Sequence, residues 1–137
     1  MIEKPVKRTY PPISPDVEQV GRTVLDAAYK IHTALGPGLL ENVYESCLAY
    51  EIRRTGTGVD TQLAVPVVYE DIRVESGLRL DMLVGNCVVV EIKAVEKMNP
   101  LYEAQLLTYL KMTQLRLGYL INFNVLHLKD GVKRFVR

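Results

Sequence analysis

The chain has 137 residues, a length that predicts one compact domain with a single core. Its net charge of +1 argues against a uniformly basic nucleic-acid-binding surface, although a local basic groove is compatible with it. No apolar run reaches the roughly 18 residues of a membrane span, and no signal peptide opens the chain. We therefore expect a cytoplasmic protein without membrane contact.

The two cysteines and two histidines give no sign of a metal-binding motif. Cys47, Cys87, His32 and His127 lie far apart, and their spacing matches no zinc site. Both cysteines are expected to be reduced packing residues rather than a disulfide. Both histidines are interpreted as structural.

The first third of the chain predicts an extended arm followed by a helix. Residues 1–13 are rich in charge and proline, so the single domain is expected to occupy residues 14–137. Ser14-Pro15 has the residue types of an N-cap and a first helical position. Apolar residues then recur at helical spacing to about Leu35, where the helix is expected to end.

A second helix and three strands are predicted next. Gly36-Pro37-Gly38 is interpreted as a tight turn, followed by a helix over residues 39–54 with Leu40 among its apolar contacts. The β-type segments cover residues 62–69, 78–84 and 88–93. Pro66 places the first of these strands at a sheet edge or a bulge.

The last third predicts a helix, a buried strand and a terminal hairpin. Asn99-Pro100 begins a helix that extends to about Met112, with Leu107 on its apolar face. Residues 118–123 read as a buried strand, and two short strands are expected on either side of Asp130-Gly131 (residues 125–128 and 132–136). The element order is ααβββαβ(ββ), an α/β fold with a central mixed sheet flanked by helices.

The apolar pattern of residues 77–94 predicts how two strands pair. A three-residue loop, residues 85–87, pairs Met82 with Val90 and directs both apolar series to one face of the sheet. The same register places Asp81 opposite Glu91, with Lys93 on that face too. A two-residue turn would separate the apolar series, so burial favours the longer loop.

Two carboxylates on adjacent strands repel, and a cation between them would offset the repulsion. One candidate is Lys93, which would make Asp81 and Glu91 part of a surface salt-bridge network. The other is a divalent cation, since Mg²⁺ prefers oxygen ligands and is typically held by one or two carboxylates. Residue types alone leave both interpretations open.

Several motifs resemble a known family. Asp81 followed by Glu91-Ile92-Lys93 resembles the signature of the PD-(D/E)XK nuclease superfamily. Residues 38–44 (GLLENVY) resemble the motif of the GxxExxY family, a small prokaryotic family within that superfamily. Residues 103–110 (EAQLLTYL) and 118–123 (GYLINF) resemble further stretches of the same family. The resemblance extends from Val17 to Phe123 and implies a restriction-endonuclease-like core.

The resemblance implies a metal site. Asp81 and Glu91 would bind Mg²⁺, for which Mn²⁺ could substitute, with the backbone carbonyl of Ile92 as a third ligand. Lys93 would position or polarise the attacking water. Glu41 matches the acidic residue that such nucleases bring toward the metal from an N-terminal helix.

The same resemblance adds Gln105 to the catalytic residues and gives Tyr44 and Glu45 supporting roles. Gln105 matches the helix glutamine that follows the ExK strand, and it could instead cap main-chain groups in the core. Tyr44 shares a helix face with Glu41, and it could instead be a packing residue. Glu45 lies one turn beyond Glu41 and could be a solvated charge.

Two positions depart from the family pattern. Leu80 stands where the superfamily name has proline, a substitution that hardly affects the metal argument. Tyr102 stands where many relatives are expected to have histidine, so no role is assigned to it.

The main functional hypothesis is a Mg²⁺-dependent nuclease acting on nucleic acid of unknown type. The alternative is a catalytically idle nucleic-acid-binding or protein-assembly module that retains the fold. A homodimer would give either of them a larger groove. Hydrolysis of a nucleotide is less favoured, because the sequence has no glycine-rich phosphate loop.

Overall fold

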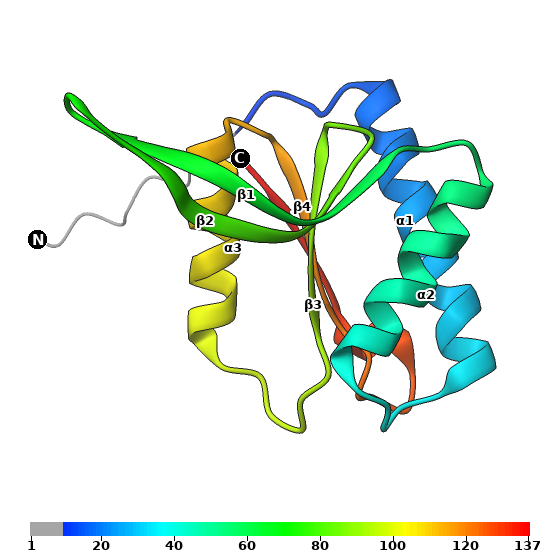
Figure 1. Cartoon of the computed structure of the whole chain (residues 1–137). Coiled ribbons are helices and arrows are strands. Elements are labelled where there is room, and N and C mark those ends of the chain that lie inside the picture. Colours follow the sequence, from blue (N-terminus) through cyan, green and yellow to red (C-terminus); the bar gives the residue numbers. More distant parts are fainter. Residues whose placement is uncertain (1–9) are drawn as a thin grey trace, which may run out of the picture.

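A mixed five-stranded sheet, in the order β1-β2-β3-β4-β5, lies between two layers of helices (Figure 1). The computed structural model describes residues 10–137. Most of the predicted N-terminal arm, residues 1–9, lies outside the described residues, and residues 10–14 form neither helix nor strand.

The three predicted helices are confirmed, and two begin as the sequence indicates. The Ser14 hydroxyl accepts a hydrogen bond from the Val17 amide at the start of the first helix. The Asn99 side chain accepts one from the Leu101 amide at the start of the third. The helices are α1 (Pro15–Leu35), α2 (Glu41–Arg54) and α3 (Pro100–Thr113).

The sheet is antiparallel except in its centre. β3 and β4 are parallel neighbours, joined by α3 as the crossover connection. The strands are β1 (Val59–Tyr69), β2 (Ile72–Val84), β3 (Val88–Lys93), β4 (Leu117–Asn122) and β5 (Val132–Val136), with a 3-10 helix η1 (Leu128–Gly131) before β5.

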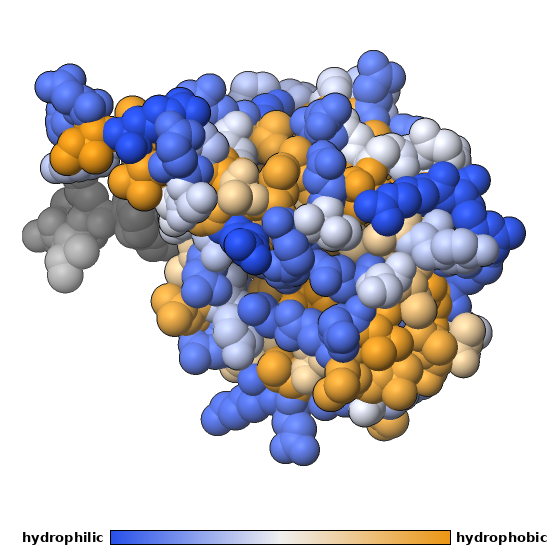
Figure 2. Space-filling view, in the orientation of Figure 1, coloured by the Kyte–Doolittle hydropathy of each residue, from blue (hydrophilic) through white to orange (hydrophobic). Residues whose placement is uncertain are grey.

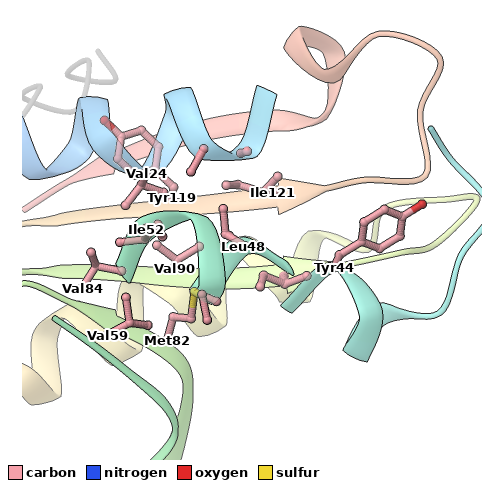
Figure 3. Close-up of a cluster of buried hydrophobic side chains, with 14 of the residues drawn as sticks. Val24, Tyr44, Leu48, Ile52, Val59, Met82, Val84, Val90, Tyr119 and Ile121 are labelled. Carbon is pink, nitrogen blue, oxygen red and sulfur yellow. The ribbon is translucent and has the colours of Figure 1, made fainter. Parts of the chain in front are cut away.

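Each face of the sheet is covered by its own hydrophobic cluster. α1 and α2 cover one face, where side chains such as Leu48, Met82 and Ile121 are fully buried (Figure 3). α3 covers the other face with Leu106 and Leu110. β3 contributes to both clusters, because alternate residues of a strand point to opposite faces.

β1 and β2 form a hairpin that is longer than predicted. β2 begins at Ile72 rather than at Leu78, so the hairpin extends past the body of the sheet as an arm, residues 66–77 (Figure 1). Its turn has Glu70 at φ 51°. The prediction for Pro66 is confirmed: β1 is an edge strand, and the register shifts between Val65 and Val67.

The predicted terminal hairpin is wrong. Residues 125–128 form no strand, and β5 pairs directly with β4. The Asn122 side chain accepts hydrogen bonds from the amides of Val95 and Asn124, both at 3.1 Å. When an Asn side chain accepts a hydrogen bond from the amide two residues later, the chain forms a turn. β4 therefore ends here, and the connection to β5 runs through η1.

Two leucines predicted to be apolar contacts are exposed. Leu40 is 74% exposed, because the chain reaches it before α2 begins and it occupies the N-cap position. Leu107 is 44% exposed, since the buried face of α3 passes through Leu106 and Leu110, one turn apart.

Cys47 and Cys87 are partly buried free thiols. Among the helices of residues 10–137, none has the length and hydropathy needed to cross a membrane.

We predict that Gly131→Ala lowers the free energy of unfolding by about 1–3 kcal/mol. A Cβ atom at Gly131 would lie 2.1 Å from the main-chain oxygen of Asn122, so the junction between η1 and β5 would have to move. Urea unfolding measures the change, with Gly58→Ala as the control because nothing lies within 4 Å of the corresponding Cβ position. Equal stability of the two variants would contradict the prediction.

Candidate metal centre

The acidic pair lies where the β2–β3 ladder ends. The predicted register is confirmed: Val84 pairs with Val88 and Met82 with Val90. Beyond that pair the Asp81 amide donates to Oε1 of Glu91 at 3.2 Å, and the Ile92 amide donates to Oδ2 of Asp81 at 2.9 Å. Each carboxylate thus accepts a hydrogen bond from a main-chain amide of the opposite strand.

Burial and a neighbouring carboxylate shift the pKa of Glu91. It is 7% exposed, and its pKa is raised to about 9, first by burial and then by the charge of Asp81 and a hydrogen bond between the two side chains. Burial and the charge of Asp81 therefore favour the protonated form of Glu91.

Glu41 approaches the pair from the other side of the sheet. It is the first residue of α2, and its pKa is raised by partial burial and then by the charge of Asp81, while Lys93 lowers it. Within residues 10–137, no three acidic, histidine or cysteine side chains converge closely enough to hold a metal ion together. Glu41 is therefore near the pair but does not complete a three-carboxylate cluster.

Lys93 does not form the predicted alternative, a surface salt-bridge network. Its ammonium group lies 4.4 Å from the centre of the Tyr102 ring, a cation–π contact. No ion pair in the described part of the chain includes Lys93, Asp81 or Glu91. The network interpretation is therefore wrong, because the lysine lies against an aromatic ring and Glu91 is buried.

Gln62 is a member of the site that the sequence analysis missed. Its side-chain nitrogen donates to Oε1 of Glu45 at 2.7 Å and to Oδ1 of Asp81 at 3.3 Å. Its backbone has φ 49°, in the left-handed region, between the β1–β2 pairs Thr61–Met82 and Leu63–Leu80. The register of that hairpin would have identified Gln62, because it places this residue opposite Asp81.

α3 turns three polar residues toward the same region. Tyr102 contacts Lys93, and the pKa of Tyr109 is raised by burial and then by the charges of Glu91 and Asp81. Gln105 is partly buried and lies between these tyrosines on one helix face, at steps of three and four residues. Tyr102 and Tyr109 were not predicted as site residues.

Tyr44 acts on the turn before α2. Its ring is fully buried and stacks on Phe123 with ring centroids 4.7 Å apart. Its hydroxyl donates to the Gly36 carbonyl at 2.6 Å and accepts from the Leu39 amide at 3.1 Å. These contacts correspond to the packing alternative, and they hold the chain that leads into Glu41.

The comparisons with known proteins agree with this geometry. The family model of the PD-(D/E)XK nuclease superfamily matches residues 18–135. The chain belongs to this superfamily. Neither the curated proteins nor the solved structures contain a match. The mixed sheet and its flanking helices are consistent with a PD-(D/E)XK nuclease fold, and membership suggests a phosphodiester hydrolase that acts on nucleic acid.

Members of the superfamily generally use divalent metals such as Mg²⁺, and the donor atoms of this chain fit such an ion. Asp81 and Glu91 offer carboxylate oxygens side by side, where a proton offsets their repulsion. The Lys93 carbonyl accepts a hydrogen bond from the Phe123 amide and therefore points toward β4. Successive carbonyls of a strand point in opposite directions, so the Ile92 carbonyl points toward β2. The Ile92 amide also points toward β2, where it donates to Asp81. Two carboxylates and a carbonyl suit Mg²⁺, which retains several waters.

We predict that Glu91→Gln stabilises the metal-free protein at neutral pH by about 1–3 kcal/mol. Glutamine resembles protonated Glu91: its carbonyl can accept from the Asp81 amide, and its amide can donate to the Asp81 carboxylate. Because burial raises the pKa of Glu91 from 4.5 to about 9, wild-type stability should fall as pH rises through this window.

Urea unfolding between pH 4 and pH 9 in chelator measures this difference, which should disappear near pH 4, where Glu91 is protonated in both states. Glu75→Gln on the exposed arm controls for the loss of one carboxylate. A stability difference that does not change with pH would contradict the prediction.

Proposed function

We propose that the protein hydrolyses phosphodiester bonds in nucleic acid with Mg²⁺ held by Asp81, Glu91 and the main-chain carbonyl of Ile92. One observation carries the proposal: the buried Glu91 and the partly buried Asp81 each accept a main-chain hydrogen bond from the opposite strand, and neither has an ion-pair partner among residues 10–137. Lys93 and Glu41 lie close enough to influence the charge of this region.

A bound Mg²⁺ would supply Lewis acidity, which polarises a phosphate and lowers the pKa of water. The chain prepares the site by holding both acids in position. The Ile92 amide and the Gln62 side chain each bind one oxygen of Asp81, and the Asp81 amide binds Glu91. The ligands therefore lose little conformational freedom when the ion binds.

Lys93 is proposed to donate to the attacking water or to an anionic phosphate oxygen. The Lys93 ammonium group contacts the Tyr102 ring and forms no ion pair with a carboxylate among the described residues. Its N–H groups are therefore available to a substrate. Glu41 is proposed to accept a hydrogen bond from a water at the open side of the pair. Gln105, between Tyr102 and Tyr109 on α3, is proposed to contact the substrate backbone.

The metal site is tested by titrating Mn²⁺ into the protein calorimetrically at millimolar concentrations, in wild type and in Asp81→Asn. We expect the variant to weaken binding by at least about tenfold, because it removes one ligand charge. Asp60→Asn is the matched control, since Asp60 is exposed on the adjacent strand and should leave binding unchanged. Equal Mn²⁺ affinity in all three proteins would exclude Asp81 as a ligand.

Catalysis is tested with end-labelled single- and double-stranded DNA and RNA in Mg²⁺. We expect Lys93→Met to retain Mn²⁺ binding and to lose about 100-fold or more in cleavage rate. Tyr102→Leu should lose roughly three- to tenfold because it removes the cation–π contact, whereas Tyr102→Phe should retain the rate. Lys93→Met cleaving at the wild-type rate would contradict the assigned role.

Metal binding without cleavage of any of these substrates would instead favour the alternative, a module that retains the fold and its ion for binding or assembly. Absence of both metal binding and cleavage would contradict the proposed function itself.

A further inference from the structure

An uncharged stretch lies on the surface beside α1 and α2. Residues 31–40 (IHTALGPGLL) contain no Asp, Glu, Lys or Arg, in a chain that is 24% charged. They span the end of α1, the turn and the N-cap of α2, and most of them are exposed. Exposed stretches of a monomeric protein normally carry charge, so this one requires an explanation.

Apolar side chains from neighbouring elements extend this stretch into a continuous surface, the α1–α2 face. Figure 2 shows an apolar area over the end of α1 and the start of α2, at the lower right of the view. We define the face by its six large, exposed apolar residues: Tyr29 (43%), Leu35 (38%), Leu39 (40%), Leu40 (74%), Tyr50 (60%) and Leu126 (84%).

Two hollows join these residues. A cavity of about 580 Å³ is lined by the apolar Tyr29, Pro37 and Leu126 and also by the polar His32, His127 and Lys129. A second cavity, of about 180 Å³, is lined by Leu35, Cys47 and Tyr50. Both border the last turns of α1, so the face combines exposed apolar side chains with hollows that a complementary surface could fill.

We infer that a second copy of this chain covers the α1–α2 face in a symmetric dimer. Three of the six residues, Leu40, Tyr50 and Leu126, are at least 60% exposed, so the face offers large apolar side chains that an interface could bury. Polar groups, including the Lys30–Glu51 ion pair, lie at its border. An apolar centre with a polar rim is the anatomy of a protein interface, and homodimer interfaces are the more apolar ones.

The absence of charge within this stretch selects the kind of partner. A nucleic acid would need cations, and a highly charged protein would need opposite charges, neither of which residues 31–40 provide. Two copies of an uncharged surface can meet around a two-fold axis without bringing like charges together. The contact would also bury Leu40, which immediately precedes Glu41, and so would hold the start of α2 in each copy.

Sedimentation velocity of the full chain from 1 to 200 µM tests the inference, which does not depend on metal binding or cleavage. We expect a wild-type dimer, and a Leu40→Asp/Leu126→Asp variant whose dimer dissociation constant rises at least about 100-fold. The control is Tyr69→Asp/Ile72→Asp on the arm, where the apolar residues are comparably exposed, at 71% and 60%. Circular dichroism verifies that both variants fold.

The native cysteines give a second readout within one molecule. Cys47 lines the face, whereas Cys87 lies near residues 12–17 and 114–116. Alkylation of Cys47 should slow at least about fivefold between 1 and 200 µM protein, and that of Cys87 should not change. In the Leu40→Asp/Leu126→Asp variant both rates should stay constant.

Three results would overturn the inference. The wild type could remain a monomer over the whole range, which would leave the face to a different partner. The dimer could survive in the face variant. It could also dissociate equally in the arm variant, which would move the interface to the arm.

Discussion

The main-chain hydrogen bonds that Asp81 and Glu91 accept across the β2–β3 pair, from the amides of Ile92 and Asp81, are the constraint on which the rest of the site depends. At the end of the β2–β3 ladder, a side-chain carboxylate of one strand accepts the hydrogen bond from a main-chain amide of the other strand. In the rest of the ladder a main-chain carbonyl has this role. The arrangement at the end of the ladder brings the carboxylate of Asp81 against the buried Glu91, which raises the pKa of Glu91 and costs stability. A site that binds a cation benefits from the same arrangement, because the ion replaces the retained proton.

All three layers of the fold supply parts of this centre. The sheet holds the acidic pair. Gln62 of the neighbouring strand, whose backbone is in the left-handed region, donates a side-chain hydrogen bond to Asp81. α2 presents Glu41 from a turn held by the buried Tyr44. α3, which connects two parallel strands, places Tyr102 beneath Lys93. The separate hydrophobic clusters on the two faces therefore determine how these groups meet where the β2–β3 ladder ends.

Two surfaces of the protein expose apolar side chains that packing within one chain does not bury. The α1–α2 face has no charge over residues 31–40, and the arm carries Tyr69 and Ile72 in the open. The face has hollows between its exposed apolar side chains, whereas the arm is a narrow two-stranded ribbon. This difference is why the dimer is assigned to the face, and it connects association to the segment that leads into Glu41.

The sequence by itself determined the helices and the pairing of β2 with β3, because capping residues and apolar periodicity act over a few neighbouring positions. That pairing was sufficient to place Asp81 beside Glu91. Only the tertiary structure decided that Gln62 joins the site, that Lys93 rests on Tyr102, and that no strand forms over residues 125–128. These features depend on partners distant in the chain, whose positions are set by packing across the sheet rather than by local pattern.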